Sequence, residues 1–240
     1  MKSRPKKRLR VLTIDVGGTS VKCQMSGRRK PVRFKSGPDL TPERMVSNVL
    51  AVTAAWRFDA ISIGYPGVVH RGAITAEPHN LGSGWIGFDF QSAFGCPVRV
   101  INDAAMQALG AYTGGSMLFL GLGTGLGSAL VVDGVVAPLE LGHFPARHGG
   151  SYESLVGERA RKRHGDRKWR RDVEQVLEDL RQAMLPDYVV LGGGNVLRLK
   201  RLPPHTRRGA NANAFTGGFR LWQHEPTTAA SLRPSIRSQT

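Results

Sequence analysis

Short apolar runs, each ending in glycine or a polar turn, dominate the first half of the chain. Runs of this kind predict buried strands, here over 9–16, which is rich in β-branched residues, and over 60–63, 98–101, 117–121 and 128–132, with 20–25 and 31–35 as antiparallel neighbours of the first. A helix is predicted from Thr41, a candidate N-cap before Pro42 at the first helical position, to Trp56. A second helix is predicted over 103–112, and a long glycine-rich loop over 64–85.

The second half of the chain has a helical pattern. Segments 152–163 and 168–184 are predicted helices, and the second carries apolar residues every three or four positions, which gives it one buried face. A strand over 188–191, a glycine turn and a helix over 210–222 complete the pattern. Strands and helices in this order indicate a mixed α/β fold. We expect a small N-terminal lobe over 1–102, a larger lobe over 103–224 and a flexible tail over 225–240.

The chain is strongly basic for a globular composition. Of its 240 residues, 34 are Lys or Arg and 18 are Asp or Glu, which gives a net charge of +16 alongside 40% hydrophobic residues. The basic residues gather in the first ten positions, over 159–171 and over 198–208. Such clusters are either solvated surface or binding sites for a polyanion: nucleic acid, a membrane surface or an inorganic polyanion. No zinc-finger spacing or aromatic RNA-binding strand accompanies them, so we expect no specific nucleic-acid partner.

The cysteines and the uncharged stretches indicate the compartment. Cys23 and Cys96 alone cannot form a disulfide scaffold, and they favour a reducing environment. No secretory signal is visible, and the longest uncharged stretch, 104–132, is interrupted by seven glycines. We therefore expect a soluble, cytoplasmic protein without a membrane partner.

Three predicted strands end in glycine-rich turns, over 15–19, 121–127 and 192–194. Glycine lets backbone N–H groups approach a ligand and point at anionic oxygens, so the set predicts a phosphate-binding site. None of the turns has the Walker-type or the dinucleotide-binding spacing. Asp15, at the end of an apolar strand, is either a cap of its turn or a carboxylate that holds Mg²⁺ through water.

Polar residues that could act on a hydroxyl compound follow later strands. Asn102 and Asp103 come directly after the strand over 98–101, and Asp103 is either a helix N-cap or a general base for a substrate hydroxyl. Glu140, His143 and Glu153 could line a polyol site or ligate a metal. One histidine with scattered carboxylates is a poor zinc site, which argues against the metal.

Taken in order, these motifs resemble those of the ROK family of sugar kinases, within the actin/hexokinase/Hsp70 superfamily. The matching segments are DVGGTSVK, GYPGVV, PHNLGSGW, VINDAAMQALG, LGLGTGLGSALVVDG and VVLGGGN. The resemblance implies a two-lobed, actin-like (ribonuclease H-like) α/β fold that closes over a sugar in a central cleft. It also implies a homodimer.

The resemblance gives each matching position a role. Asp103 would be the general base that draws a proton from the 6-hydroxyl of glucose or a related hexose, and Asp15 would assist Mg²⁺. The hexose would be bound by Asn80, Asn102, Glu140, His143 and Glu153. The phosphoryl donor would be bound by Gly17, Gly18, Thr19, Lys22, Gly123, Thr124, Gly125, Gly193 and Gly194.

One departure from the common family pattern narrows the prediction. Most members carry a cysteine-rich zinc motif after the E-x-G-H element, whereas this chain has FPARHGGSYES there, so we expect no zinc. The cysteine-free form resembles the polyphosphate glucokinase branch, which uses polyphosphate and often ATP to phosphorylate glucose. Members that act as repressors carry an N-terminal helix-turn-helix module. The first strand is predicted to start at Leu9, too early for such a module to precede it, so we do not expect a regulator.

Two functions of different class follow. The first is phosphoryl transfer from polyphosphate, ATP or both to the 6-hydroxyl of glucose, or an ATP-dependent reaction of the same kind on another hexose. The second is a sugar-kinase fold without catalysis that binds polyanions or nucleic acid through its basic clusters. The Asn102-Asp103 pair beside intact glycine turns favours the enzyme.

Overall fold

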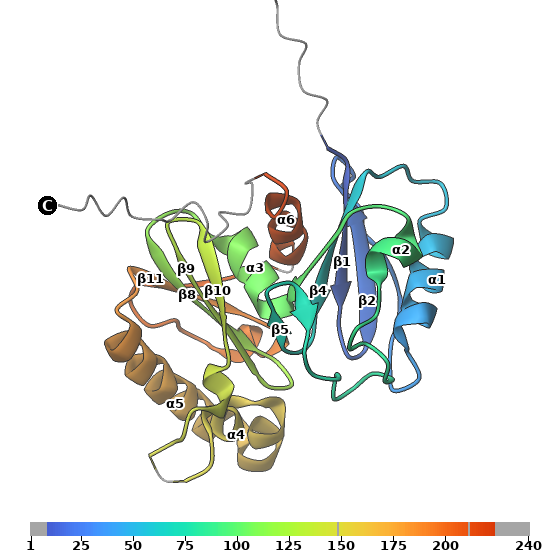
Figure 1. The fold of residues 1–240 in the computed structure, drawn as a ribbon. Helices are drawn as coiled ribbons and strands as arrows, with labels where there is room; N and C mark the ends of the chain where they lie inside the picture. The colour runs from blue at the N-terminus through green and yellow to red at the C-terminus, as the bar shows by residue number, and fades with distance from the viewer. Residues whose placement is uncertain (1–8, 148, 211, 224–240) are drawn as a thin grey trace, which may run out of the picture.

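The computed structural model describes residues 9–147, 149–210 and 212–223, which form two five-stranded sheets with helices on their faces (Figure 1). The first sheet has the strand order β3-β2-β1-β4-β7, and the second has the order β10-β9-β8-β11-β12. The expected tail over 225–240 lies outside the described residues, as does most of the basic start. No helix in the described part of the chain is long and apolar enough to cross a membrane.

The first sheet brings three strand ends to one edge. Its strands are β1 (Val11–Val16), β2 (Ser20–Met25), β3 (Val32–Lys35), β4 (Ala60–Tyr65) and β7 (Val98–Asn102). β1, β4 and β7 run parallel, so their carboxyl ends lie side by side. Helices α1 (Pro42–Val52) and α2 (Phe90–Phe94) cover one face, where Met45 and Phe90 share a core with Leu12 and Ile14.

The second sheet is buried on both faces. Its strands are β8 (Ser116–Leu122), β9 (Leu126–Val132), β10 (Val135–Leu139), β11 (Tyr188–Gly192) and β12 (Thr206–Arg208). Successive side chains of β8 point to opposite faces of the sheet, as in any strand, and so pack into two different hydrophobic cores. Leu118 and Leu120 pack with α5 (Glu158–Met184), whereas Met117 and Phe119 pack with α3 (Asp103–Ala111).

Helices α3 and α6 (Asn213–Arg220) cross between the two sheets (Figure 1). The two helices approach closely because Gly217 of α6 packs directly against the backbone of α3. A Cβ on Gly217 would lie 1.8 Å from the Met106 carbonyl oxygen. α6 also packs on β1, and the Ser62 hydroxyl donates to the Gly218 carbonyl at 2.6 Å. The last described helix therefore returns to the sheet that the first hundred residues build.

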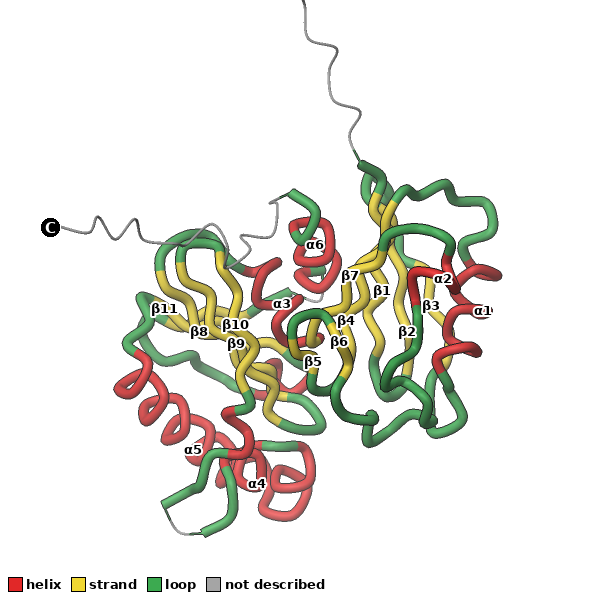
Figure 2. Tube along the Cα trace, viewed as in Figure 1, coloured by secondary structure: helices red, strands yellow, loops and turns green. Residues whose placement is uncertain are grey.

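Most predicted elements are confirmed within a few residues, and the differences have local causes. The helix predicted from Thr41 to Trp56 ends at Val52, and Thr53 at its C-cap donates both its N–H and its hydroxyl to the Val49 carbonyl. The segment predicted as a glycine-rich loop contains the hairpin of β5 (Val69–His70) and β6 (Ala73–Ile74), which turns at Gly72 with φ of 82°. The other elements absent from the prediction are α2, β10, β12 and the 3-10 helices η1 (Leu141–His143) and η2 (Gly194–Arg198) (Figure 2).

The long helical region contains the predicted break and one that was not predicted. The prediction placed a break over 164–167, and Gly165 interrupts α5 there with φ of 79°, a backbone conformation that favours glycine. The additional break lies at Gly157, where α4 (Tyr152–Val156) ends and α5 starts directly afterwards.

Candidate active site

Two acidic residues lie at the shared edge of the first sheet. Asp15 is opposite Gly64 in the β1–β4 pairing, and Tyr65 is opposite Asn102 in the β4–β7 pairing, so Asp103 begins α3 beside this edge. Gly64 makes room for that helix, since a Cβ there would lie 2.3 Å from Met106 Cε and 3.5 Å from Asp103 Cα. The glycine that ends β4 thereby allows the first turn of α3 to approach the sheet.

The Asp103 carboxylate is unusual for its basicity. Burial raises its pKa to about 7, with further contributions from the negative charges of Asp15 and Glu140, although its hydrogen bond from the Ala104 N–H opposes the rise. That bond is 2.7 Å long and uses Oδ1. A carboxylate with a pKa near neutrality can accept a proton from a substrate and release it again.

Asn102 is the N-cap of α3, which separates two interpretations that the sequence left open. Its Oδ1 accepts from the Ala105 N–H at 3.0 Å, and its Nδ2 donates to the Gly67 carbonyl at 3.1 Å. The cap position is therefore occupied by Asn102, not by Asp103. The Nδ2 bond also holds the GYPGVV loop against the start of α3, and a hexose contact by Asn102 stays a prediction.

Asn80 and the first glycine turn lie together. A Cβ on Gly18 would be 3.2 Å from Asn80 Cβ, so the absence of a side chain lets the loop that carries Asn80 lie against the turn. Thr19 and Asn80 are both exposed. Asp15, whose side chain is 13% exposed, pairs with Lys22 at 3.3 Å. This arrangement combines backbone amides, a carboxylate and an ammonium group within one short segment.

The residues predicted for a polyol site gather around the second glycine turn. Glu153 Oε2 accepts from the Leu126 N–H at 3.2 Å, and a Cβ on Gly125 would lie 2.1 Å from the same oxygen. Glu140 and His143 are 3.8 Å apart, between Glu140 Oε2 and His143 Nε2. Burial raises the pKa of Glu140, and Glu153 adds to the rise while His143 opposes it.

The second glycine turn, Gly123–Gly125, is fixed to two neighbouring segments. The Glu158 N–H that starts α5 donates to the Gly123 and Thr124 carbonyls at 3.1 and 3.2 Å. Asn195 Nδ2 donates to the same Gly123 carbonyl at 3.3 Å. Gly193 has φ of 82°, and a Cβ on it would lie 2.3 Å from the Leu122 carbonyl oxygen, so only glycine fits there.

A cavity of about 270 Å³ opens beside the third glycine turn. Its walls include Phe119, the turn Gly192–Gly194, Leu197 and Ala210. An apolar ring on one side and a glycine backbone on the other suit a flat group joined to a phosphate chain.

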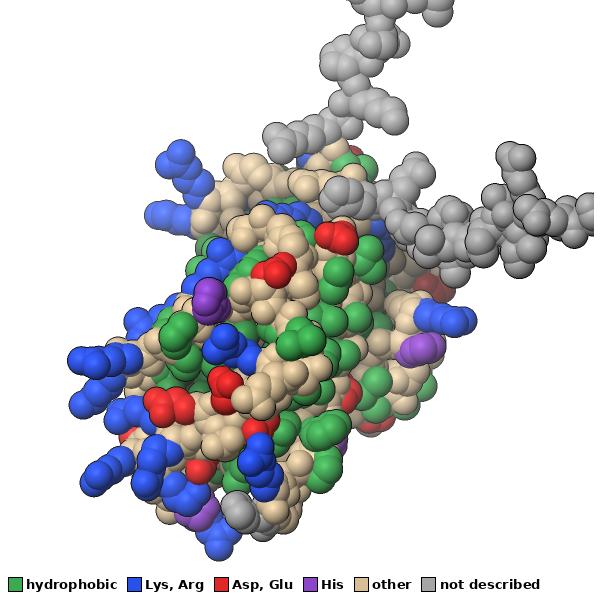
Figure 3. Space-filling view, turned by 90° about the vertical axis from the view of Figure 1, so that its left-hand side faces the viewer, with side chains coloured by type: hydrophobic (Ala, Val, Ile, Leu, Met, Phe, Trp, Pro, Cys, Tyr) green, Lys and Arg blue, Asp and Glu red, His purple; other side chains and the backbone are tan. Residues whose placement is uncertain are grey.

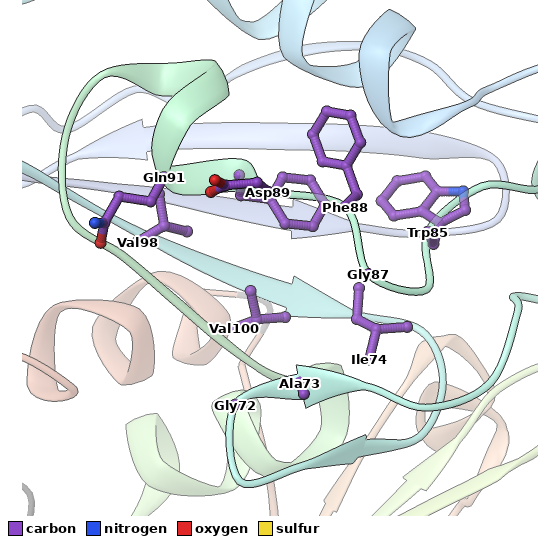
Figure 4. Close-up of a pocket in the computed structure, with 11 residues that line it drawn as sticks. Gly72, Ala73, Ile74, Trp85, Gly87, Phe88, Asp89, Gln91, Val98 and Val100 are labelled. Carbon is purple, nitrogen blue, oxygen red and sulfur yellow. The ribbon is translucent and has the colours of Figure 1, made fainter.

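A second hollow of about 260 Å³ lies on the first lobe, between the β5–β6 hairpin, α2 and β7 (Figure 4). Trp85, Phe88 and Phe90 line it, and it contains none of the predicted site residues. We assign it no role in the site.

Sequence reasoning missed three residues that organise the site. Glu77 accepts backbone N–H groups of Gly84, Trp85 and Ile86 at 3.2–3.3 Å and so closes the loop that carries Asn80. Glu158 and Asn195 hold the second turn, as described above. The only available signal for Asn195 was its place directly after the three glycines, and the charge of Glu158 was hidden within a basic segment.

Comparison with known proteins agrees with this geometry. The ROK family model matches residues 11–151. A polyphosphate glucokinase of Mycobacterium leprae (strain TN) is 28% identical over 205 residues, and the match spans 75% of this chain but only 62% of that protein. A polyphosphate glucokinase of Mycobacterium tuberculosis (strain CDC 1551 / Oshkosh) is 28% identical over 207 residues, covering 75% of this chain and 76% of that protein.

The fold comparison gives the same family. The crystal structure of an inorganic polyphosphate/ATP-glucomannokinase from Arthrobacter sp. strain KM superposes with a TM-score of 0.77 at 25% identity, covering 90% of this chain and all of that chain. The predicted two-lobed, actin-like fold is thereby confirmed. Since the family model also matches more than half of its residues, the chain belongs to the ROK family.

Proposed function

We propose that this protein transfers a phosphoryl group from inorganic polyphosphate, ATP or both to the 6-hydroxyl of glucose or a closely related hexose. The observation that carries the proposal is Asp103: a carboxylate with a pKa of about 7, at the strand edge that also holds the first glycine turn. The names of the similar proteins, polyphosphate glucokinase and polyphosphate/ATP-glucomannokinase, support the same reaction class.

In the proposed reaction Asp103 accepts the proton of the sugar hydroxyl as the new O–P bond forms. The bond between the transferred phosphorus and its bridging oxygen breaks, and the leaving group departs as ADP or as a polyphosphate shorter by one unit. A base with a pKa near 7 is substantially ionised at neutral pH and is still basic enough to take up the proton. Phosphoryl transfer depends on positioning and charge neutralisation, which the backbone amides of the glycine turns would supply.

The remaining predicted residues take supporting parts. Asn80, Glu140, His143 and Glu153 would orient the sugar through its other hydroxyls. Asp15 suits Mg²⁺, because this ion is commonly held by one or two carboxylates while phosphates and water complete its shell. When bound, the ion would neutralise donor charge.

Both donors have a physical basis. The cavity beside Gly192–Gly194 has the size and lining that suit a nucleoside, which supports ATP. The names of the relatives support polyphosphate.

A coupled assay that detects glucose 6-phosphate, run with glucose, mannose and other common hexoses and with each donor in turn, tests the proposal. We expect product with at least one donor. No product with any combination would refute the proposed reaction, and Asp103→Asn provides the matched inactive control.

A further inference from the structure

Most of the net positive charge of the molecule lies in two segments of the second lobe. Residues 158–171 hold eight basic and two acidic residues, and residues 198–208 hold five basic and none acidic. These net charges of +6 and +5 make up +11 of the +16 of the chain. Figure 3 shows Lys and Arg side chains gathered along one edge of the molecule.

The two segments meet in the fold, and the first of them starts at the second glycine turn. Glu158, whose N–H bonds to the Gly123 carbonyl, pairs with Arg161 at 2.8 Å and with Lys162 at 3.5 Å. Arg161 also pairs with Asp166, and Asp166 pairs with Arg170 and Arg198. An unbroken chain of charged contacts therefore leads from the turn to η2.

The network keeps a positive excess at the surface. Four cations (Arg161, Lys162, Arg170 and Arg198) share two carboxylates. The side chains of Lys162 and Arg198 are 70% and 50% exposed. Arg170 Nε also donates to the Arg198 carbonyl at 2.8 Å, which fixes α5 against η2.

Two further cations extend this surface beyond the network. At 100° per residue, Arg167 and Arg171 follow Arg170 around α5, on the side away from the buried Trp169. Both are exposed, and no ion pair is found for either of them within the described residues. Lys168, by contrast, lies on the other side of the helix and is paired with Asp172 at 2.7 Å.

We propose that this surface, Lys162, Arg167, Arg170, Arg171 and Arg198, binds the distal part of an inorganic polyphosphate chain whose terminal phosphate lies at Gly123–Gly125. The inference rests on the proposed function and specifies where the distal part of a long donor binds. Only long polyphosphate would contact this surface, because ATP and tripolyphosphate are too short to extend across α5 from the turn.

The features of the surface favour polyphosphate over nucleic acid. Single-stranded nucleic acid is usually held by exposed aromatic side chains on which the bases stack. Residues 158–171 and 198–208 contain one aromatic residue, Trp169, and its side chain is fully buried. A polymer of phosphates alone needs only the cations and the amides of the turn.

The test compares Arg167→Gln/Arg171→Gln with a control of equal charge change, Arg29→Gln/Lys30→Gln. The control residues are exposed and lie in the β2–β3 turn, at the end of the first sheet opposite Gly17. Both replacements on α5 keep good helix formers and break no ion pair found in the described residues. KM is measured at saturating glucose for long-chain polyphosphate, tripolyphosphate and ATP over a range of salt concentrations.

We expect the α5 variant to raise KM for long-chain polyphosphate about tenfold or more at about 0.1 M salt, and to lower the slope of log KM against log salt by about 1.4, at about 0.7 per lost contact. KM for tripolyphosphate and ATP, and every KM of the control, stay within about twofold. Equal changes for all donors, or no change, would overturn the inference while leaving the sugar kinase activity intact.

Direct binding separates the remaining outcomes. Wild-type protein that phosphorylates glucose from ATP but does not bind long-chain polyphosphate also overturns the inference. So does a variant that loses affinity for duplex or single-stranded DNA while its KM for polyphosphate is unchanged. Absence of sugar phosphorylation from every donor would instead remove the proposed function itself.

Discussion

Replacing Asp103 by Asn tests the proposed base with almost no change of shape. The amide oxygen of Asn can still accept the Ala104 N–H, so the first turn of α3 is retained. The variant loses only the ability to take a proton. A positioned general base contributes about 10²–10⁴-fold to rate, and we expect kcat to fall by at least that factor with little change in the KM for either substrate.

Although Asp103→Asn should lower activity, we expect it to raise the stability of the folded protein. The pKa of Asp103 is about 7, against 3.8 for an unperturbed aspartate. At about 1.4 kcal/mol per pH unit, keeping the native carboxylate ionised above pH 7 costs at most about 4 kcal/mol, and partial solvent access reduces this. Asn does not ionise, so the variant should be more stable than the wild type at pH 8.

The sign of the pH dependence follows from proton uptake. Between about pH 4 and pH 7 the native carboxyl is more protonated than the unfolded one, so the wild-type free energy of unfolding falls as pH rises through this window. The gain from Asp103→Asn should therefore be largest at pH 8 and absent near pH 4. For a chain of this length each kcal/mol corresponds to about 2–4 °C in Tm.

Thermal unfolding at pH 4.5, 6 and 8, together with kcat/KM profiles of the wild type from pH 5 to 9, measures both effects. Asp39→Asn, at an exposed aspartate, is the control and should change neither activity nor the pH dependence of Tm. The wild-type kcat/KM should rise with pH and level off above about 7. A variant with near-normal turnover, or one whose Tm advantage does not grow with pH, would refute the assignment.

Three further substitutions test the supporting structure. Gly193→Ala should abolish donor use and lower Tm, because its Cβ would meet the Leu122 carbonyl at 2.3 Å, whereas Gly194→Ala, with open space around it, should leave Tm nearly unchanged. Glu77→Gln should raise the KM for hexose several-fold and leave kcat and the donor KM unchanged, because it loosens the loop that carries Asn80, a predicted hexose-binding residue. Arg220→Gln should lower the free energy of unfolding by about 1–3 kcal/mol in urea titration, because the Arg220 guanidinium donates to three carbonyls at the end of α3.

The strands and the glycine turns could be predicted from sequence because their signals are local. An apolar run followed by glycine defines β1 or β8 without any knowledge of the partner strand. The missed elements lack such signals: β5 and β6 are two residues each, and β10 carries Pro138 and exposed positions at a sheet edge. Their geometry depends on neighbouring strands that the sequence does not identify.

The site was predictable as a set of motifs but not as a set of contacts. That Asn102 caps α3, and that Asn195 reaches Gly123 across 72 positions, depends on how the strands pair. The Glu158–Arg161–Asp166 network was likewise invisible, because its two acids are dispersed among eight basic residues. Sequence separation limited the prediction of the Asn195–Gly123 contact, whereas the Asn102 cap and the ion-pair network are local in sequence and were hidden by competing candidate partners.

The position of Asp103 sets two electrostatic effects against each other, and their magnitudes decide its chemistry. At the first position of α3 the helix dipole stabilises a carboxylate by about 0.3–1 kcal/mol, which would lower its pKa. Burial and the charge of Asp15 act in the other direction, and the resulting pKa of about 7 shows that they prevail. An aspartate that were merely a helix cap would be exposed and strongly acidic. The fold instead places a second carboxylate on the neighbouring strand β1 and partly buries both, which destabilises the ionised native state and gives Asp103 the basicity that its proposed role requires.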